Sequence, residues 1–174
     1  MPTDRIAECA AVDLALDELH EPEATVRHDS EGKPMLEGAD GSISISHALN
    51  AQGKPYAAVL LAPDLAGIDI ETFRPQLARV APRVFTRQEQ DAVDKIEDAW
   101  ERRGLRCLIW TVKEAAWKAF GPALAFEHEI ELLEFPDVGD MRKGRICTVR
   151  IRNSEHSFFL AVLDGDLGVS LGPV

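Results

Sequence analysis

Gly67-Ile68-Asp69-Ile70-Glu71 is the stretch of this chain that says most about its fold. In an extended strand, successive side chains point to opposite faces. Ile68 and Ile70 therefore share one face, and Asp69 and Glu71 share the other. The flanking residues are apolar, so the pattern predicts an interior strand that carries a pair of carboxylates.

A second informative stretch, Trp-Thr-Val-Lys-Glu-Ala-Ala-Trp-Lys, occupies residues 110–118. Its spacing predicts a helix on which Glu114 and Lys118 share one face, because residues four apart are neighbours on a helix surface. A strand bearing two carboxylates and a helix bearing a Glu–Lys pair can converge on a cation bound to a phosphate. Oxygen ligands without nearby His or Cys favour Mg²⁺ or Mn²⁺ over zinc.

Plainer readings of both stretches remain open. Asp69 and Glu71 could lie on a solvated strand face. Glu114 and Lys118 could form an ordinary surface pair, worth about 0.3 kcal/mol.

Working outward, hydrophobic periodicity and turn residues predict the remaining elements. Helices are expected at 5–20, 76–82, from Thr86 to about Trp100 after a capping box, and at 105–120, with Gly104 as an interruption and Gly121-Pro122 as the stop. Strands are expected at Thr25–Arg27, Ser42–Ser46, Tyr56–Ala62, 66–72, 129–135, 145–152, 156–164 and 167–171. We expect 56–62 to be a central strand that forms a hairpin with 66–72. The order of helices and strands predicts an α+β fold.

Composition limits the class of protein. With 174 residues, 45% of them hydrophobic and 28% charged, the chain is expected to be one soluble domain or two small lobes that share a core. No apolar run approaches the roughly 20 residues of a membrane helix, and acidic residues interrupt the start, so we expect a cytoplasmic protein. A net charge of −11 argues against a nucleic-acid binder. Cys9, Cys107 and Cys147 are far apart and are expected to be buried thiols.

Two cationic positions carry a weaker signal. His47 follows Ser46 at the end of a predicted strand, where it is either a structural residue or a group that hydrogen-bonds a phosphate or protonates a leaving group. Lys33 lies in the Gly32-Lys33-Pro34 turn and by itself is weak evidence for a binding site.

Four elements in this order resemble the 4′-phosphopantetheinyl transferases: Gly32-Lys33-Pro34, Ile45-Ser46-His47, Gly67 to Glu71, and Trp110 to Lys118. Residues 85–89, Phe-Thr-Arg-Gln-Glu, also resemble the helix start that lies between the last two elements in that family. The resemblance covers about residues 5–121. It is closer to the larger surfactin-type branch than to the short trimeric acyl-carrier-protein synthases.

The resemblance implies an enzyme that moves the 4′-phosphopantetheine arm of coenzyme A onto a serine of an acyl or peptidyl carrier protein and releases 3′,5′-ADP. It implies two similar α+β lobes in one chain, related by pseudo-two-fold symmetry, which we place at 1–63 and 64–174. Coenzyme A would lie in the cleft between them. Because one chain supplies both lobes, we expect a monomer.

By the same resemblance, specific residues receive roles. Asp69, Glu71 and Glu114 would hold Mg²⁺, and Glu114 would also act as the base for the incoming serine. Lys118 would contact the transferring phosphate, with Asp69 and His47 as further catalytic residues. The predicted contacts of coenzyme A are Lys33 near its 3′-phosphate, His47 at its phosphates, and Pro34, Ser46, Lys113 and Lys118.

The first helix departs from the family pattern, because it is acidic and no Lys or Arg lies between Arg5 and Arg27. Arg5, Arg27 or His28 could replace the missing cations at the 3′-phosphate. Two other functions remain alternatives: a coenzyme A-binding pseudoenzyme and an interaction domain of the same fold. The pathway (fatty-acid, polyketide or nonribosomal peptide synthesis) stays open, as does whether the chain stands alone or belongs to a larger synthase.

Overall fold

The computed structural model describes residues 10, 12–14, 16–18, 24–30, 32–50 and 52–174. The helix expected at 5–20 lies partly outside the described residues, which exclude Arg5. Residues 10, 12–14 and 16–18 are helical. Val12 and Leu16 are buried there and belong to an apolar cluster with Ala24.

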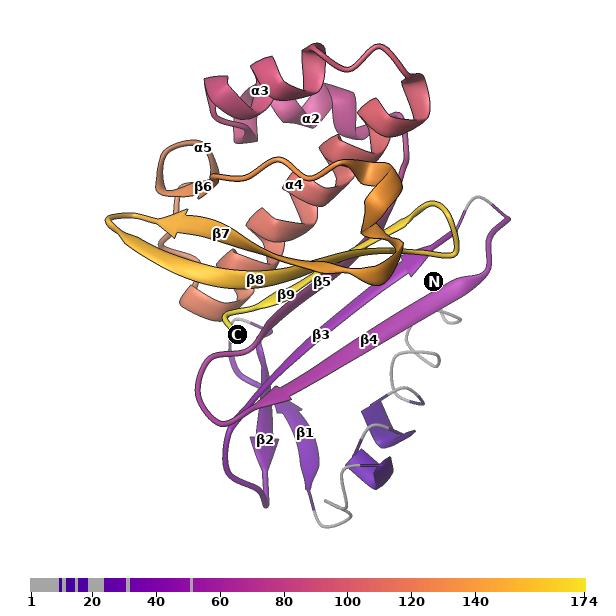
Figure 1. Cartoon of the computed structure of the whole chain (residues 1–174). Helices are drawn as coiled ribbons and strands as arrows, with labels where there is room; N and C mark the ends of the chain where they lie inside the picture. The colour runs from indigo at the N-terminus through magenta and orange to yellow at the C-terminus, as the bar shows by residue number, and fades with distance from the viewer. Residues whose placement is uncertain (1–9, 11, 15, 19–23, 31, 51) are drawn as a thin grey trace.

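The first part of the chain forms two antiparallel hairpins (Figure 1). Strand β1 (Thr25–His28) pairs with β2 (Pro34–Glu37), and β3 (Ser42–Leu49) pairs with β4 (Pro55–Ala62). The predicted turn at Gly32-Lys33-Pro34 is confirmed, since the Asp29 N–H donates to the Lys33 carbonyl at 3.0 Å. Strand β3 runs beyond Ser46, so His47 lies inside the strand rather than after it.

The second part combines a five-stranded antiparallel sheet with helices (Figure 1). The strands, in sheet order, are β5 (Gly67–Thr72), β9 (Leu167–Gly172), β8 (Ser154–Leu163), β7 (Arg145–Ile151) and β6 (Ile130–Leu132). The helices are α2 (Leu77–Val84), α3 (Arg87–Asp94), α4 (Ala99–Phe120), α5 (Phe126–Glu129) and a 3₁₀ helix, η1 (Val138–Lys143). This arrangement agrees with the predicted α+β class.

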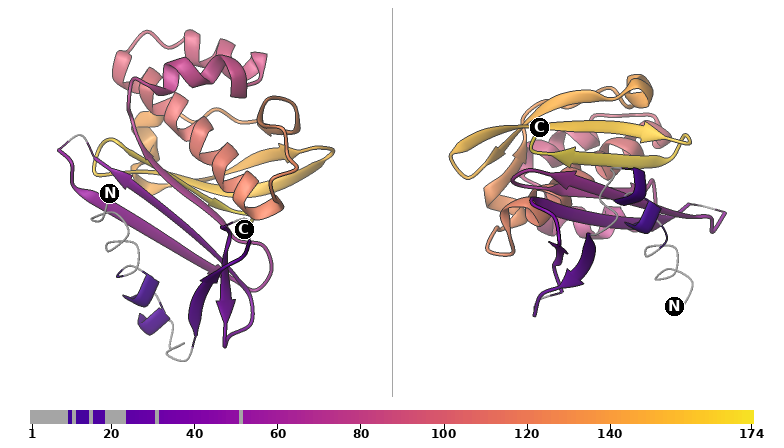
Figure 2. Two further views of the ribbon diagram at one scale, coloured as in Figure 1. Left: turned by 180° about the vertical axis from the view of Figure 1, so that it is seen from behind. Right: turned by 90° about the horizontal axis from the view of Figure 1, so that it is seen from below.

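Helix α4 packs against the five-stranded sheet, and the main apolar core lies between them (Figure 2). Leu108, Ile109 and Val112 of α4 are fully buried there, as are Phe158 and Leu160 of β8. No helix within the described ranges is long and apolar enough to cross a membrane.

The predicted hairpin between 56–62 and 66–72 is wrong. Strand β4 pairs with β3, and β5 pairs with β9, the last strand of the chain. On its other edge, β5 faces β3, and the N–H groups of Ile68 and Ile70 donate to the hydroxyls of Ser44 and Ser46. Those donors are therefore satisfied by side chains rather than by a second backbone ladder. Strand β4 is half-buried along most of its length and is not a central strand.

The helix boundaries also differ from the prediction at one point. The Thr86–Glu89 capping box is present and opens α3, but α3 ends at Asp94, and α4 begins at Ala99 after the N-cap Asp98. Gly104 does not interrupt α4. A Cβ there would lie 2.4 Å from Val138 Cγ1, so this glycine permits close packing. The predicted stop at Gly121 is confirmed, and its φ of 99° suits glycine.

Gly67 allows β5 to approach α4 closely. A Cβ at this position would lie 1.9 Å from the backbone oxygen of Ala115 in α4. We expect Gly67→Ala to lower the free energy of unfolding by about 2–3 kcal/mol, because strand and helix must separate to admit the methyl group. Urea unfolding followed by circular dichroism measures this loss. A midpoint equal to that of the unmodified protein would show that the contact has room to relax.

Candidate active site

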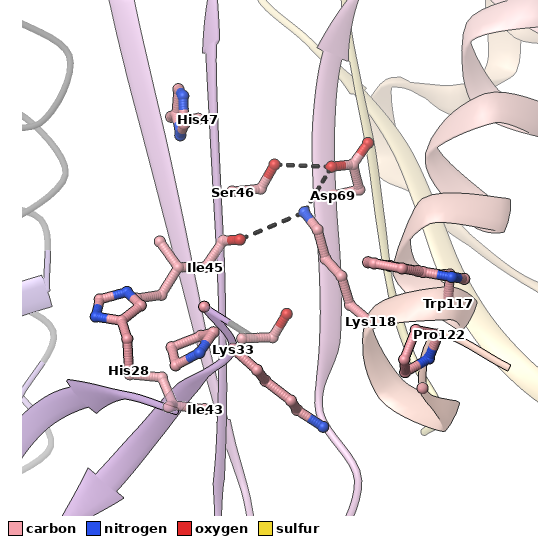
Figure 3. A pocket seen from close by; sticks show the side chains of 14 residues that line it. His28, Lys33, Ile43, Ile45, Ser46, His47, Asp69, Trp117, Lys118 and Pro122 are labelled. Carbon is pink, nitrogen blue, oxygen red and sulfur yellow. Dashed lines mark hydrogen bonds and ion pairs between the residues drawn. The ribbon is translucent and has the colours of Figure 1, made fainter. Parts of the chain in front are cut away.

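Lys118 and Asp69 meet where the last turn of α4 crosses β5 (Figure 3). The Lys118 Nζ lies 2.8 Å from Asp69 Oδ1. It also donates to the Ile68 carbonyl at 2.9 Å and to the Ile45 carbonyl of β3 at 3.3 Å. One ammonium group therefore joins β3, β5 and α4 at a single point.

Ser46 completes the surroundings of Asp69. Its hydroxyl donates to Asp69 Oδ1 at 2.8 Å and accepts from the Ile70 N–H at 3.2 Å. Burial raises the pKa of Asp69, and the positive charge of Lys118 opposes that rise. The carboxyl group is thus held in one orientation by a hydroxyl and an ammonium group.

Glu114 lies one turn before Lys118 on α4. Among the described residues it makes no hydrogen bond or ion pair, although it is half-buried. Burial and the negative charges of Asp69 and Glu71 raise its pKa to about 7, while Lys118 acts in the opposite direction. A half-buried carboxyl group without a close counter-charge suits either a cation ligand or a general base near neutral pH.

Glu71 is engaged differently from the other two carboxylates. One oxygen, Oε1, accepts from the Thr72 N–H at 2.8 Å, and the other forms an ion pair with Arg74. Burial raises its pKa, and the Thr72 N–H and Arg74 oppose the rise.

The fit of a divalent cation follows from these surroundings. In the described part of the chain, no group of three or more His, Cys, Asp or Glu side chains is arranged to hold a metal. Asp69 and Glu114 carry hard oxygen donors of the kind that Mg²⁺ and Mn²⁺ bind, and a cation would neutralise their charge. Glu71, the third predicted ligand, forms an ion pair with Arg74, and its role as a ligand stays a prediction.

A pocket of about 660 Å³ opens beside Asp69 and Lys118 (Figure 3). Six residues predicted from the sequence line it: Lys33, Pro34, Ser46, His47, Asp69 and Lys118. The first four come from the β1–β2 and β3–β4 hairpins, and the last two from β5 and α4. The lining also includes His28, which the sequence suggested as a substitute cation. The structure thus brings together residues that lie up to 94 positions apart in the sequence, from His28 to Pro122.

The structure does not place Lys113 where the predicted contact with coenzyme A requires it. Its side chain is fully buried, pairs with Glu89 at 3.0 Å and donates to the carbonyls of Phe126 and Ile130. Successive residues on an α-helix point about 100° apart, so Lys113 cannot share the face that Glu114 and Lys118 present to β5. Lys113 therefore holds α4 to its neighbours and does not line the pocket.

Comparison of the sequence with known proteins identifies the family of the chain. The family model described as the 4′-phosphopantetheinyl transferase superfamily matches residues 66–164, which is more than half of the chain. The chain belongs to the 4′-phosphopantetheinyl transferase superfamily. The resemblance noted from the sequence is thereby confirmed at the level of the superfamily.

Members of the superfamily are found among curated proteins as well. The chain is 27% identical over 134 residues to the L-aminoadipate-semialdehyde dehydrogenase-phosphopantetheinyl transferases of Homo sapiens, Pongo abelii and Mus musculus. The matched region covers 68% of this chain and 42% of each relative, so the chain spans less than half of their length.

Arg74 and Trp117 are among the residues near the site that were not predicted. Arg74 follows Glu71 by three positions, and this spacing was the only local signal for the ion pair. Trp117 lines the pocket and packs against Phe126, with ring centroids 6.4 Å apart. Its position next to Lys118 in the sequence could have suggested it.

Proposed function

We propose that this member of the superfamily transfers the 4′-phosphopantetheine group of coenzyme A to a serine of an acyl or peptidyl carrier protein, with Mg²⁺ or Mn²⁺ as cofactor. The observation that carries the proposal is the contact of Asp69 with Lys118 in the lining of a pocket that Lys33, Ser46 and His47 also line. Glu114 does not line this pocket, but it is near enough for the charges of Asp69 and Lys118 to act on its pKa. Carboxylates for a cation and ammonium groups for phosphate oxygens are what phosphoryl transfer requires.

Each residue of the site has its own role in the proposed reaction. The serine oxygen of the carrier forms a bond to the phosphorus that bears the pantetheine arm, and the bond from that phosphorus to the departing 3′,5′-ADP breaks. Glu114 accepts the serine proton, directly or through a water. Lys118 neutralises charge on the phosphate, and Asp69, Glu71 and Glu114 would hold the cation. When bound, Mg²⁺ supplies further neutralisation of the pyrophosphate oxygens.

The pocket supports a finer description of the enzyme. Lys33, Ser46 and His47 belong to residues 1–63, and Asp69 and Lys118 belong to residues 64–174. We propose that these segments are the two lobes of a surfactin-type transferase with pseudo-two-fold symmetry, and that coenzyme A binds between them. A pocket lined by both segments of one chain is consistent with a monomer. The cytoplasmic location stays a prediction.

The experiment that tests the proposal uses intact-protein mass spectrometry. Protein, coenzyme A, Mg²⁺ and an apo carrier protein are mixed, and the carrier should gain the mass of one phosphopantetheine group. Lack of any gain with apo carriers from fatty-acid, polyketide and peptide synthesis would reject the enzymatic function. Thermal stabilisation by coenzyme A without a mass gain would then select the pseudoenzyme, and neither effect would select an interaction domain.

Cation binding is expected to release a proton from Glu114. Because the pKa of this group is about 7 and a metal ligand must be deprotonated, binding of Mn²⁺ at pH 7 should release about half a proton. Calorimetry in buffers of different ionisation enthalpy measures this number. The release should vanish in Glu114→Gln. An unchanged release in that variant would assign the proton to another group.

A further inference from the structure

Trp117 is the largest side chain in the lining of the pocket. Figure 3 shows it with Pro122 on the α4 side of the pocket, whereas Ile43 and Ile45 line the β3 side. The next residue in the chain is Lys118, one of the charged groups of the site. The half-buried indole therefore forms a wall beside those charged groups, and its orientation helps to set the shape of the pocket.

The ring of Phe126, at the start of α5, packs on Trp117 without lining the pocket itself. Its centroid lies 6.4 Å from that of Trp117 and 6.1 Å from that of Trp110. Both distances fall in the range of favourable aromatic pairs, about 4.5–7 Å. Trp110 and Trp117 are seven residues apart, so they lie on one face of α4, two turns from each other. One phenyl ring thus packs against both indoles.

The backbone of Phe126 is anchored to the buried side of α4. Its carbonyl accepts a hydrogen bond from the Lys113 Nζ at 2.8 Å, and Lys113 is itself fully buried and paired with Glu89. Just before Phe126, the Ala125 N–H donates to the Glu129 carboxylate at 2.8 Å. The phenyl ring is therefore carried by a fixed segment, so it can hold the Trp117 indole in one orientation.

A plain apolar contact is the alternative explanation of this packing. All three rings are only half-buried, and they lie at the edge of the main core. As a plain contact, the packing would stabilise α4 and α5 and have no effect on the pocket. The two explanations differ in what they predict for ligand binding.

We propose that Phe126 is a positioning residue, which holds the indole of Trp117 as one wall of the pocket. The inference rests on the proposed function, in which coenzyme A occupies that pocket. Without the phenyl ring, Trp117 gains freedom to rotate, and binding must then pay the entropy of ordering it. Loss of Phe126 should therefore weaken ligand binding, while the groups proposed to carry out the transfer stay in place.

The first test reads Trp117 in the unliganded protein. The chain has three tryptophans, so Trp100→Phe and Trp110→Phe together leave Trp117 as the only one. In this background, Phe126→Leu should raise the Stern–Volmer constant for acrylamide quenching and shift the emission maximum to the red. Phe126→Tyr, which keeps the ring, should do neither. The measurement needs neither coenzyme A nor a carrier protein.

The second test reads the ligand in the otherwise unmodified chain. Phe126→Leu should raise the KM for coenzyme A, and its Kd measured by calorimetry with Mg²⁺, by about five- to tenfold. The kcat for modification of a carrier should stay within about twofold. Phe126→Tyr should restore both constants. Phe126→Leu should add no further loss to Trp117→Leu, because Phe126 acts only through Trp117.

Phe120→Leu is the matched control. Phe120 is the last residue of α4, is half-buried, and packs against His156 with ring centroids 4.7 Å apart. It does not line the pocket. Its replacement makes the same chemical change next to the same segment, and it should leave both the quenching of Trp117 and the KM unchanged.

Three results would overturn the inference. Unchanged quenching in Phe126→Leu would show that the Trp117 indole does not depend on this ring. A KM that stays constant would leave only the plain apolar contact. Equal effects of Phe120→Leu and Phe126→Leu would indicate general loosening of α4. If the unmodified protein neither binds coenzyme A nor modifies a carrier, the proposed function fails, whereas the fluorescence still decides whether Phe126 holds Trp117.

Discussion

Replacing Glu114 with glutamine is expected to lower kcat/KM for modification of a carrier protein by at least about a thousandfold. The substitution removes the group proposed to accept the serine proton, and proton transfer by a positioned side chain contributes about 10²–10⁴-fold. It also removes one of the carboxylates predicted to hold the cation. The size and shape of the side chain are preserved, so the packing of α4 should be retained. Initial rates from mass spectrometry measure the effect.

A control separates catalysis from folding. Glu101→Gln makes the same chemical change in the first turn of the same helix, away from the pocket. It should leave the rate within about twofold, as expected of a surface substitution. Both variants should have the circular dichroism spectrum of the unmodified protein. If Glu114→Gln retains more than a tenth of the activity, Glu114 is neither the base nor an essential ligand.

Loss of the Lys113 charge is expected to be the most destabilising single change near the site. In Lys113→Met, Glu89 would lose its counter-charge in a fully buried position, at a cost of about 3–5 kcal/mol. Burial raises the pKa of Glu89 and lowers that of Lys113, while each charge opposes the shift of the other. Guanidinium unfolding measures the loss.

The pH dependence of this loss has a definite sign. Without Lys113, the folded state binds the Glu89 proton more tightly than the unfolded state does, because burial disfavours the carboxylate. The stability that Lys113→Met loses at pH 8 should therefore be partly recovered as the pH falls towards about 4.5, the ordinary pKa of a glutamate side chain. A deficit that stays constant between these pH values would contradict the buried-charge explanation.

Two further variants complete the comparison. The double variant Glu89→Gln/Lys113→Met should lose less free energy of unfolding than the two single variants lose together, because neither partner is then left charged. Lys95→Met removes an exposed lysine and should cost within about 0.5 kcal/mol. Additive losses would mean that Glu89 and Lys113 act independently.

Features that depend on neighbouring residues could be predicted from the sequence. The alternation along β5 predicted that Asp69 points to the other face of the strand from Ile68 and Ile70. The contact of Asp69 with Lys118 shows that its side chain faces α4. The capping box at Thr86 and the stop at Gly121 are likewise local, because each satisfies backbone groups within a few residues.

Features that depend on distant partners could not be predicted. The apolar character of residues 56–62 suggested a central strand, but pairing is decided by which backbone edge is free in the folded chain. Residues 44 and 46 read as ordinary strand serines, and nothing local indicates that their hydroxyls cap β5. The lining role of Lys33 and His47 came from the family resemblance, since an exposed cation in a hairpin has many possible roles.

The serine contacts along β5 have a consequence for the behaviour of the molecule in concentrated solution. A sheet ends at its last strand, and a row of unpaired N–H groups there invites a strand from another molecule to add. In this protein the hydroxyls of Ser44 and Ser46 accept hydrogen bonds from the N–H groups of Ile68 and Ile70. The strand that carries Asp69 is thereby closed to intermolecular pairing, and self-association through this edge is blocked without a further backbone ladder.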